Sequence, residues 1–415
     1  MIFYKYKEKI LLSKYKYDFE ETDENALVDY KGNIYVLNKL PVEKSRMCYK
    51  ASSLSQLFIE DENLKLINET VSNLPKWLKD AVIEGRVMCI NTNYQNYLSL
   101  IDERELKDKS VVTITGMGDV GGILTTGLRL LGNGSISKIN IYDKDINKIR
   151  RFELECNAIL PGDFNENYPN VSGIDESDLF NCDMFVFCVS TGVPEVGKED
   201  VDVRIAQLKG NSNIISHYAK LARANNFKGI FAVVSDPVDL LCKAAYIESN
   251  MDNDGNFDYL GLKPDQIKGY GLGVMYARAA YYAKDINEDK SFLREGRAYG
   301  PHGEDLVIAN SISSYNERNS LYLTEKARKS NLEVRAAGFK PYIAPALSSG
   351  SLSLIATLKG DWHYSTNFIG GAYFGCKNRE TSLGIEFECC SIPENLFKKL
   401  EITYKNLKDF SIEEV

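Results

Sequence analysis

From about residue 108 onward, apolar runs of strand length alternate with longer segments in which apolar residues recur at helical spacing. The runs lie at 111–116, 138–143, 183–189 and 229–235, and the helix-like segments at 120–131, 145–157 and 202–226. Helical crossovers of this length are typical of parallel strands. The pattern predicts an α/β fold in which a doubly wound parallel sheet carries helices on both faces.

The regularity changes on both sides of this region. Beyond residue 272, long helical segments at 273–286, 317–336, 342–358 and 393–409 surround a hairpin-like stretch at 362–376. Before residue 108, apolar runs at 26–30 and 34–37 flank Lys31-Gly-Asn as in a hairpin, and 53–86 reads as two helices broken near Pro75. We predict three domains: a small α+β domain at 1–107, a Rossmann domain at 108–272 and an α+β catalytic domain at 273–415.

Composition and charge narrow the function classes. Hydrophobic residues make up 44% of the 415, charged residues 26%, and the net charge is −8 without a long basic run. This balance is typical of a soluble globular protein, and the sequence has no basic cluster of the kind that binds nucleic acid. No segment has the length or apolarity of a membrane span or a signal peptide, so we expect a cytoplasmic protein.

Cysteine and histidine spacing gives no metal signature. Nine cysteines form no CxxC pair, which fits free thiols in a reducing compartment. The three histidines, His217, His302 and His363, are far apart and lack cysteine partners at ligand spacing. We therefore expect no metal site, and we interpret His217 and His363 as structural residues.

A glycine-rich turn joins the first predicted strand to its helix. Gly116-Met117-Gly118-Asp119-Val120-Gly121 matches G-x-G-x-x-G, a weak signal alone that gains weight from its strand-to-helix position. The first glycine makes the turn, the second admits a pyrophosphate and the third lets helix and strand pack closely. The helix N-terminus then attracts the phosphate.

An acidic residue follows at the expected distance. Asp143 ends the next predicted strand, 22 residues after Gly121, where a carboxylate receives the ribose hydroxyls of a dinucleotide. Such a carboxylate would repel the 2′-phosphate of NADP, so NAD is the predicted cofactor. The alternative is an exposed turn residue in the charged run 143–148.

Three further segments resemble the lactate/malate dehydrogenase family in order and spacing. They are Val234-Ser-Asp-Pro-Val-Asp239, Gly269-Tyr-Gly-Leu-Gly-Val-Met-Tyr-Ala-Arg278 and Gly300-Pro-His-Gly303. The 24 residues between Arg278 and His302 match the interval between that family's arginine and catalytic histidine. The resemblance covers about residues 108–400 and implies an NAD-dependent dehydrogenase that acts as a homodimer or homotetramer. It adds Ser190, Thr191, Gly192 and Ser235 to the expected cofactor contacts.

The resemblance also gives the matched residues chemical roles. Arg278 offers a planar fork for a substrate carboxylate, and His302 can exchange a proton with the substrate oxygen. Arg204 follows a stretch similar to the family's active-site loop, where it would polarise the carbonyl, and Glu195 or Lys198 would select the substrate. Taken separately, an arginine on a helix or a histidine in a turn is more often a surface residue; their joint order favours the functional interpretation.

Three positions depart from the family. Met275 stands where the family keeps the aspartate that orients the histidine, and Asp236 replaces an asparagine. Asp236 could pair with His302, accept a hydrogen bond from an amino group on the substrate, or only adjust a cofactor contact. Lys340 replaces a small residue of the pocket wall, where it would meet a second acidic group on the substrate or extend into solvent.

Three functions remain open at this point. The first is reversible hydride transfer between NAD(H) and a small 2-hydroxy/2-oxo acid, with His302 as acid/base. The second is reduction of an imine or amino-bearing oxo acid in a specialised biosynthetic pathway, suggested by Asp236 and Met275. The third is a catalytically silent dinucleotide-binding protein, because the histidine lacks its usual partner.

Overall fold

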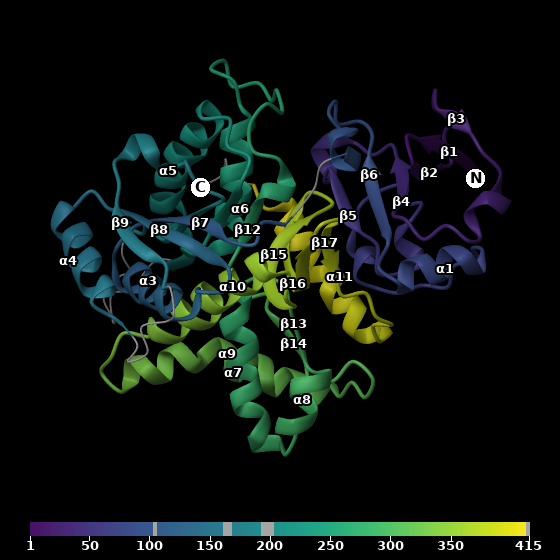
Figure 1. Cartoon of the computed structure of the whole chain (residues 1–415). Coiled ribbons are helices and arrows are strands. Elements are labelled where there is room, and N and C mark those ends of the chain that lie inside the picture. The colour runs from purple at the N-terminus through teal and green to yellow at the C-terminus, as the bar shows by residue number, and fades with distance from the viewer. Residues whose placement is uncertain (103–105, 161–167, 192–202, 412–415) are drawn as a thin grey trace.

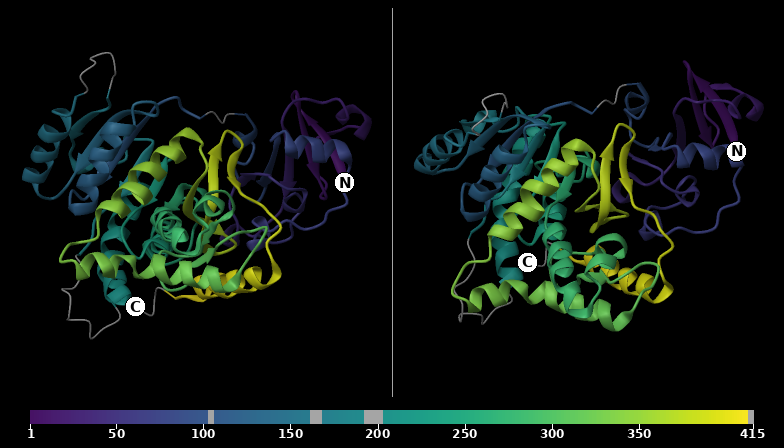
Figure 2. Two further views of the ribbon diagram at one scale, coloured as in Figure 1. Left: turned by 90° about the horizontal axis from the view of Figure 1, so that it is seen from below. Right: turned by 60° about the horizontal axis from the view of Figure 1, so that its bottom comes forward.

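The computed structural model describes residues 1–102, 106–160, 168–191 and 203–411; the side chains of Ala26 and of 203–207 are outside this description. Its main feature is one sheet in the order β3-β1-β2-β4-β6-β5-β17-β16-β15-β12-β11-β10-β7-β8-β9. The N-terminal strands lie at one end, and β7–β9 lie at the other (Figure 1). Strands β15–β17 stand between them in every view (Figures 1 and 2).

The predicted doubly wound sheet is confirmed. Its parallel strands are β7 (Ser110–Thr115), β8 (Ile136–Tyr142), β9 (Asn170–Gly173), β10 (Met184–Phe187), β11 (Ile230–Val233) and β12 (Ile267–Gly269). Between them run α3 (Asp119–Leu131), α4 (Ile146–Asn157), α5 (Val203–Ala224) and α6 (Val238–Asn250). The chain leaves β7 toward β8 on one side and β10 lies on the other, so the topological switch point falls beside the glycine loop.

Strand β10 shows why both faces of this sheet are covered. Phe185 and Phe187 belong to the cluster that contains side chains of α5 and α6, whereas Met184 and Val186 belong to the cluster of α3. Successive side chains of a strand point to opposite faces. An unbroken apolar run therefore requires helices on both sides, as in other parallel sheets.

The C-terminal part follows the predicted helices closely. Its helices are α7 (Leu272–Tyr282), α8 (Asp289–Glu295), α9 (Glu317–Ala336), α10 (Leu352–Lys359) and α11 (Glu394–Asp409). The strands are β13 (Arg297–Tyr299), β14 (Val307–Ala309), β15 (His363–Ile369), β16 (Ala372–Thr381) and β17 (Gly384–Phe387). The helix expected at 342–358 starts instead as a π-helical segment, η8 (Pro345–Ser351), which continues into α10.

Two predictions for the N-terminal part are wrong. The expected hairpin around Gly32 does not form: Glu24–Leu27 is a 3₁₀ turn, η1, and β4 (Ile34–Asn38) pairs in parallel with β2 (Lys9–Ser13) and β6 (Val87–Asn91). All five residues of β4 are buried, as expected for an inner strand. The remaining strands are β1 (Ile2–Tyr6), β3 (Glu20–Glu21) and β5 (Cys48–Lys50).

The first of the two helices expected in 53–86 is also missing. The structure has two 3₁₀ turns, η3 (Leu54–Gln56) and η4 (Leu64–Leu66), and a single helix, α1 (Lys76–Ile83), after Pro75. The side chains of Ser53 and Asn63 accept hydrogen bonds from the backbone two residues onward. Such local bonds favour caps and turns over continuous helix.

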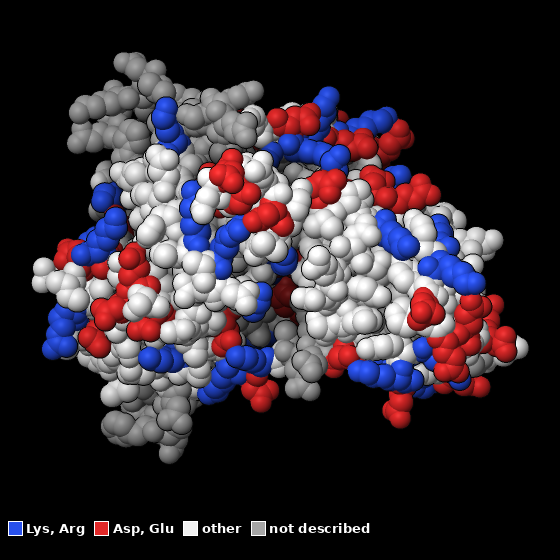
Figure 3. All heavy atoms as spheres, turned by 90° about the horizontal axis from the view of Figure 1, so that it is seen from above, with Lys and Arg blue, Asp and Glu red and all other residues white. Residues whose placement is uncertain are grey.

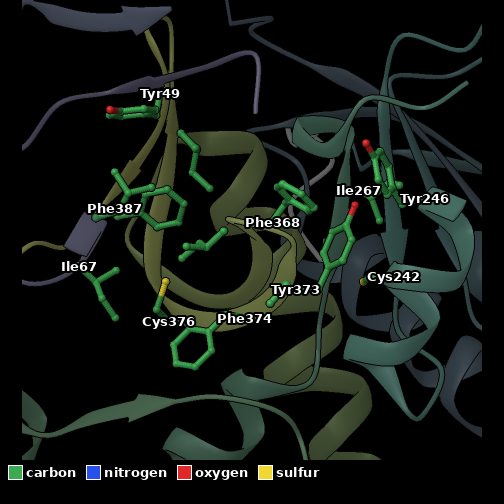
Figure 4. Close-up of a cluster of buried hydrophobic side chains, with 14 of the residues drawn as sticks. Tyr49, Ile67, Cys242, Tyr246, Ile267, Phe368, Tyr373, Phe374, Cys376 and Phe387 are labelled. Carbon is green, nitrogen blue, oxygen red and sulfur yellow. The ribbon is translucent and has the colours of Figure 1, made fainter. Parts of the chain in front are cut away.

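The N-terminal part packs directly on the rest of the chain. Strand β5 pairs in parallel with β17, where Lys50 and Glu386 form an ion pair of 2.9 Å. Figure 4 shows Tyr49 and Ile67 from the N-terminal part within one cluster with Cys242, Ile267 and Phe374. This hydrophobic core crosses both boundaries predicted from the sequence, and the three-domain division stays a prediction.

The surface carries both signs of charge. Lysine and arginine side chains are interspersed with aspartate and glutamate on the face seen from above (Figure 3). In the described parts of the chain, no helix combines the length and apolarity needed to cross a bilayer.

Candidate active site

The three glycines of the 116–121 loop occupy three different environments. Gly116 has φ of +92°, and a Cβ there would lie 2.8 Å from the backbone of Cys188. A Cβ on Gly121 would lie 1.9 Å from the Gly116 carbonyl oxygen, whereas one on Gly118 would meet nothing within 4 Å. The loop therefore turns at Gly116, packs tightly at Gly121 and leaves open space at Gly118, as a pyrophosphate requires.

Asp143 lies beside this loop at the end of β8. Its carboxylate accepts hydrogen bonds from the backbone N–H groups of Met117 (2.7 Å) and Asp145 (2.9 Å), and Lys148 Nζ lies 3.6 Å away. The side chain is 13% exposed. Each carboxylate oxygen has a second lone pair, so hydroxyl groups of a ribose can still be bound there.

A buried asparagine connects the ends of two neighbouring strands. Asn211 on α5 accepts hydrogen bonds from the N–H and the hydroxyl of Thr191 (2.9 and 3.3 Å) and donates one to the Asp236 carbonyl oxygen (2.7 Å). Ser235 donates to the Val189 carbonyl oxygen at 2.7 Å. Sequence analysis did not assign Asn211 a role, because a single asparagine within a helix has no distinctive spacing.

The histidine and the aspartate singled out in the sequence are in contact. His302 Nδ1 lies 2.7 Å from Asp236 Oδ1, and the two side chains are 17% and 48% exposed. A carboxylate can only accept, so the proton of this hydrogen bond is on Nδ1 and Nε2 is left for proton exchange. Asp236 thus takes a position from which it orients the imidazole.

Two further groups hold His302 in place. The buried carboxylate of Asp239 accepts the His302 backbone N–H at 3.1 Å and the Thr366 hydroxyl at 2.6 Å. A Cβ on Gly271 would lie 2.7 Å from the His302 Cβ, so only glycine allows this approach. Asp239 belongs to the Val234–Asp239 motif recognised in the sequence. Its place in that motif did not predict its contact with His302, which is 63 positions away.

Arg278 lies half-buried on α7, one turn after Met275. Its Nη1 donates to the Met275 sulfur and to the Ala327 carbonyl oxygen, both at 3.5 Å. Burial lowers the pKa of Arg278, and the negative charge of Asp236 acts in the opposite direction. Within the described residues, no carboxylate forms an ion pair with this guanidinium.

Lys340 lies on the surface next to the glycine loop. Its ammonium group forms an ion pair of 2.9 Å with Asp119, the first residue of α3, and its side chain is 78% exposed. The contact directs the lysine toward the glycine loop. The exposed side chain agrees with the alternative in which Lys340 extends into solvent, and its contact with a substrate stays a prediction.

Part of the expected site cannot be described. Gly192, Glu195 and Lys198 lie outside the described residues. Arg204 lies in α5, near its N-terminus, but its side chain is outside the description as well. Its role stays a prediction.

Comparisons with known proteins agree with the motifs. Residues 110–258 match the model of the lactate/malate dehydrogenase NAD-binding domain. L-lactate dehydrogenase from Treponema denticola is 29% identical over 215 residues, which are 52% of this chain and 60% of that enzyme. L-lactate dehydrogenase 1 from Staphylococcus aureus is 23% identical over 193 residues, which are 46% of this chain and 55% of that enzyme. The chain thus matches little more than half the length of these relatives.

Solved structures show the same fold over a longer stretch. A malate dehydrogenase from Archaeoglobus fulgidus in complex with NADH has a TM-score of 0.59 at 17% identity, covering 73% of this chain and 99% of that one. A lactate dehydrogenase from a Medee basin deep-sea metagenome library has a TM-score of 0.58 at 18% identity, with coverage of 73% and 98%. Each match leaves about a quarter of this chain uncovered.

Proposed function

Because residues 110–258 match the NAD-binding domain of lactate/malate dehydrogenases, we propose that this chain is a divergent member of that family and an NAD-dependent dehydrogenase of small 2-hydroxy/2-oxo acids. The observation that carries the proposal is the contact between His302 and Asp236 at the carboxyl end of the sheet, where open α/β sheets bind their ligands. The environments of Gly116, Gly118 and Gly121 fit a bound dinucleotide. NAD, when bound, supplies the hydride acceptor and, in its reduced form, the hydride.

His302 moves the proton of the reaction. In the direction of reduction, the C2 carbon of the oxo acid receives the hydride, and His302 Nε2 donates a proton to the carbonyl oxygen, which becomes a hydroxyl group. In the opposite direction Nε2 takes this proton back. Asp236 holds Nδ1 and stabilises the charged imidazole, a function that Met275 cannot perform.

Arg278 binds the carboxylate of the substrate. Its guanidinium can form two parallel hydrogen bonds to a carboxylate, which fixes the orientation of C2 relative to His302. Its partial burial strengthens this interaction because less water competes. The family resemblance gives Arg204 the role of polarising the carbonyl. We further propose that the protein acts in the cytoplasm as a homodimer or homotetramer. Residues 1–107 contribute none of the catalytic groups named above.

A test follows NADH absorbance with a panel of 2-oxo acids, with and without added amines. We expect turnover of at least one 2-oxo acid without amine, and loss of that turnover in His302→Ala. The control is His217→Ala, because His217 is exposed and paired with Glu176. Turnover by His302→Ala at the wild-type rate would contradict the assignment of the acid/base.

Asp236 also favours a second candidate, the reduction of an imine or an amino-bearing oxo acid. Its carboxylate is 48% exposed beside the histidine, where the family has a neutral amide. An ammonium or iminium group would be attracted to such a carboxylate. Formation of a secondary amine, only when a 2-oxo acid and an amine are supplied together, would favour this candidate over the first.

A further inference from the structure

An acidic side chain stands where the cofactor's phosphates are expected. Asp119 lies between the second and third glycines of the loop and is the first residue of α3. The backbone N–H groups and dipole of a helix N-terminus attract an anion. The Asp119 carboxylate opposes this attraction, so a phosphate approaching the open space at Gly118 meets a like charge unless a cation compensates it.

Lys340 provides that cation. Its Nζ lies 2.9 Å from Asp119 Oδ2, although the two residues are 221 positions apart. The negative charge of Asp119 raises the pKa of Lys340, so the amine stays protonated at neutral pH. An ammonium group has three donors and can hold Asp119 while it donates to a second acceptor.

The segment that carries Lys340 is anchored to the same helix as Asp119. Five residues after Lys340 begins η8, which packs on α3. Ser351 donates to the Leu124 carbonyl oxygen at 3.0 Å, and a Cβ on Gly127 would lie 2.2 Å from the Ser351 hydroxyl oxygen. This close and buried packing keeps the segment beside the glycine loop.

The same π-helical segment reaches toward the substrate side. The Ser349 hydroxyl accepts the Val274 N–H and donates to the Gly271 carbonyl oxygen, both at 2.8 Å. These contacts are at the start of α7, the helix of Arg278. η8 therefore lies between the helix of the cofactor loop and the helix that carries Arg278. Lys340 lies on the side of η8 that faces the cofactor loop.

We propose that Lys340 binds the pyrophosphate of the dinucleotide, bridging a phosphate oxygen and Asp119, and does not bind a second acidic group of the substrate. The inference rests on the proposed function, since it requires a dinucleotide at the glycine loop. It accounts for the acidic residue in the loop: Asp119 positions the lysine, and the lysine cancels the charge of Asp119.

The test compares three probes on the full-length protein: NADH, ADP-ribose, which keeps the pyrophosphate, and adenosine, which lacks it. Lys340→Met should weaken NADH and ADP-ribose about tenfold, the loss expected for one charge-assisted hydrogen bond, and leave adenosine unchanged. Asp119→Asn should bind NADH at least as tightly as the wild type, because the amide oxygen can still accept a hydrogen bond from Lys340 while the repulsive charge is removed. Lys329→Met, which removes a lysine paired with Glu325 on α9, is the control and should bind like the wild type.

Three outcomes would overturn the proposal. If Lys340→Met binds ADP-ribose as tightly as the wild type but raises the KM of dicarboxylic oxo acids, the lysine serves the substrate. If it changes neither quantity, the ion pair belongs to the surface alone. If the wild type binds no dinucleotide, the proposed function itself fails, and this result is distinct because it needs no variant.

Discussion

At the scale of single residues, the candidate site depends on the carboxylate of Asp236, which contacts the catalytic histidine proposed here, His302. Met275 stands where the family resemblance predicts an aspartate, and Asp236, between β11 and α6, contacts Nδ1 of His302 instead. Asp236→Asn keeps the shape but loses the charge that stabilises the imidazolium. In a Ser-His-Asp triad the same change lowers kcat about 10⁴-fold, so we expect a large fall in kcat with little change in NADH affinity.

The control for this variant is Asp145→Asn, because Asp145 caps α4 away from His302. Steady-state kinetics and a thermal melt of both variants separate catalysis from folding. If Asp236→Asn retains the wild-type kcat at an unchanged melting temperature, Asp236 has no role in orienting the histidine.

The second prediction concerns His363, which burial keeps neutral. Desolvation lowers its pKa from 6.5 to about 4, and its ring contacts Thr357 and the Asp361 carbonyl oxygen. The unfolded chain therefore binds this proton first, and the free energy of unfolding falls as the pH drops from 6.5 to about 4. The shift corresponds to about 3 kcal/mol.

Urea unfolding of the wild type and His363→Gln at several pH values measures this contribution. The difference between the two proteins should shrink on acidification, since the variant has no imidazole to protonate. Parallel pH profiles for wild type and His363→Gln would show that His363 does not titrate within the fold.

Residue roles were predictable where spacing carried them. Motif spacing singled out the glycine loop, Asp143, Arg278 and His302, and Asp236 was singled out as a departure from a motif; their roles stay predictions. Asp239 and Asn211 were missed because their contacts join distant elements and leave no local pattern. The ion pair of Lys340 with Asp119 was not predicted for the same reason, because it depends on the packing of η8 against α3.

At the scale of elements, the junction between the N-terminal part and the rest depends on a buried ion pair. Arg46 and Glu62 are 2% and 0% exposed and lie 3.2 Å apart. Glu62 also accepts the backbone N–H of Gly370, in the turn between β15 and β16. Glu62→Ala would leave the guanidinium buried without its carboxylate, at a cost of about 3–5 kcal/mol in the free energy of unfolding.

The double variant Arg46→Met/Glu62→Met is the informative comparison. Replacing both members of a buried pair by apolar residues is often neutral or stabilising. We therefore expect the double variant to be more stable than Glu62→Ala in urea unfolding. An equal loss in both would indicate that packing volume, and not the unpaired charge, determines stability here.

Elements were predictable where periodicity lasted over many residues. The helices 120–131, 145–157 and 317–336 agree with α3, α4 and α9 to within a residue at each end. The predictions for the N-terminal part failed where short turns compete with regular structure, as at Ser53 and Asn63. The parallel pairing of β4 with β2 and β6 could not be predicted, because partners distant in the sequence determine it.

At the scale of the whole molecule, the continuous sheet and core predict cooperative unfolding. The chain has two tryptophans, Trp77 on α1 and Trp362 just before β15. In Trp77→Phe the tryptophan fluorescence comes only from Trp362 and follows unfolding around it. In Trp362→Phe it comes only from Trp77. Because one hydrophobic cluster joins the two parts, we expect urea midpoints of the two variants to coincide. Two separate midpoints would show that residues 1–107 unfold independently.

Isotopic labelling tests most directly whether this site transfers a hydride. The protein is supplied with NADH deuterated at nicotinamide C4, on each face in turn, and with the 2-oxo acids of the panel. The account predicts that one face transfers its deuterium to C2 of a 2-hydroxy acid product, and that His302→Ala does not. NADH binding without deuterium in any product, from either face, would contradict the account.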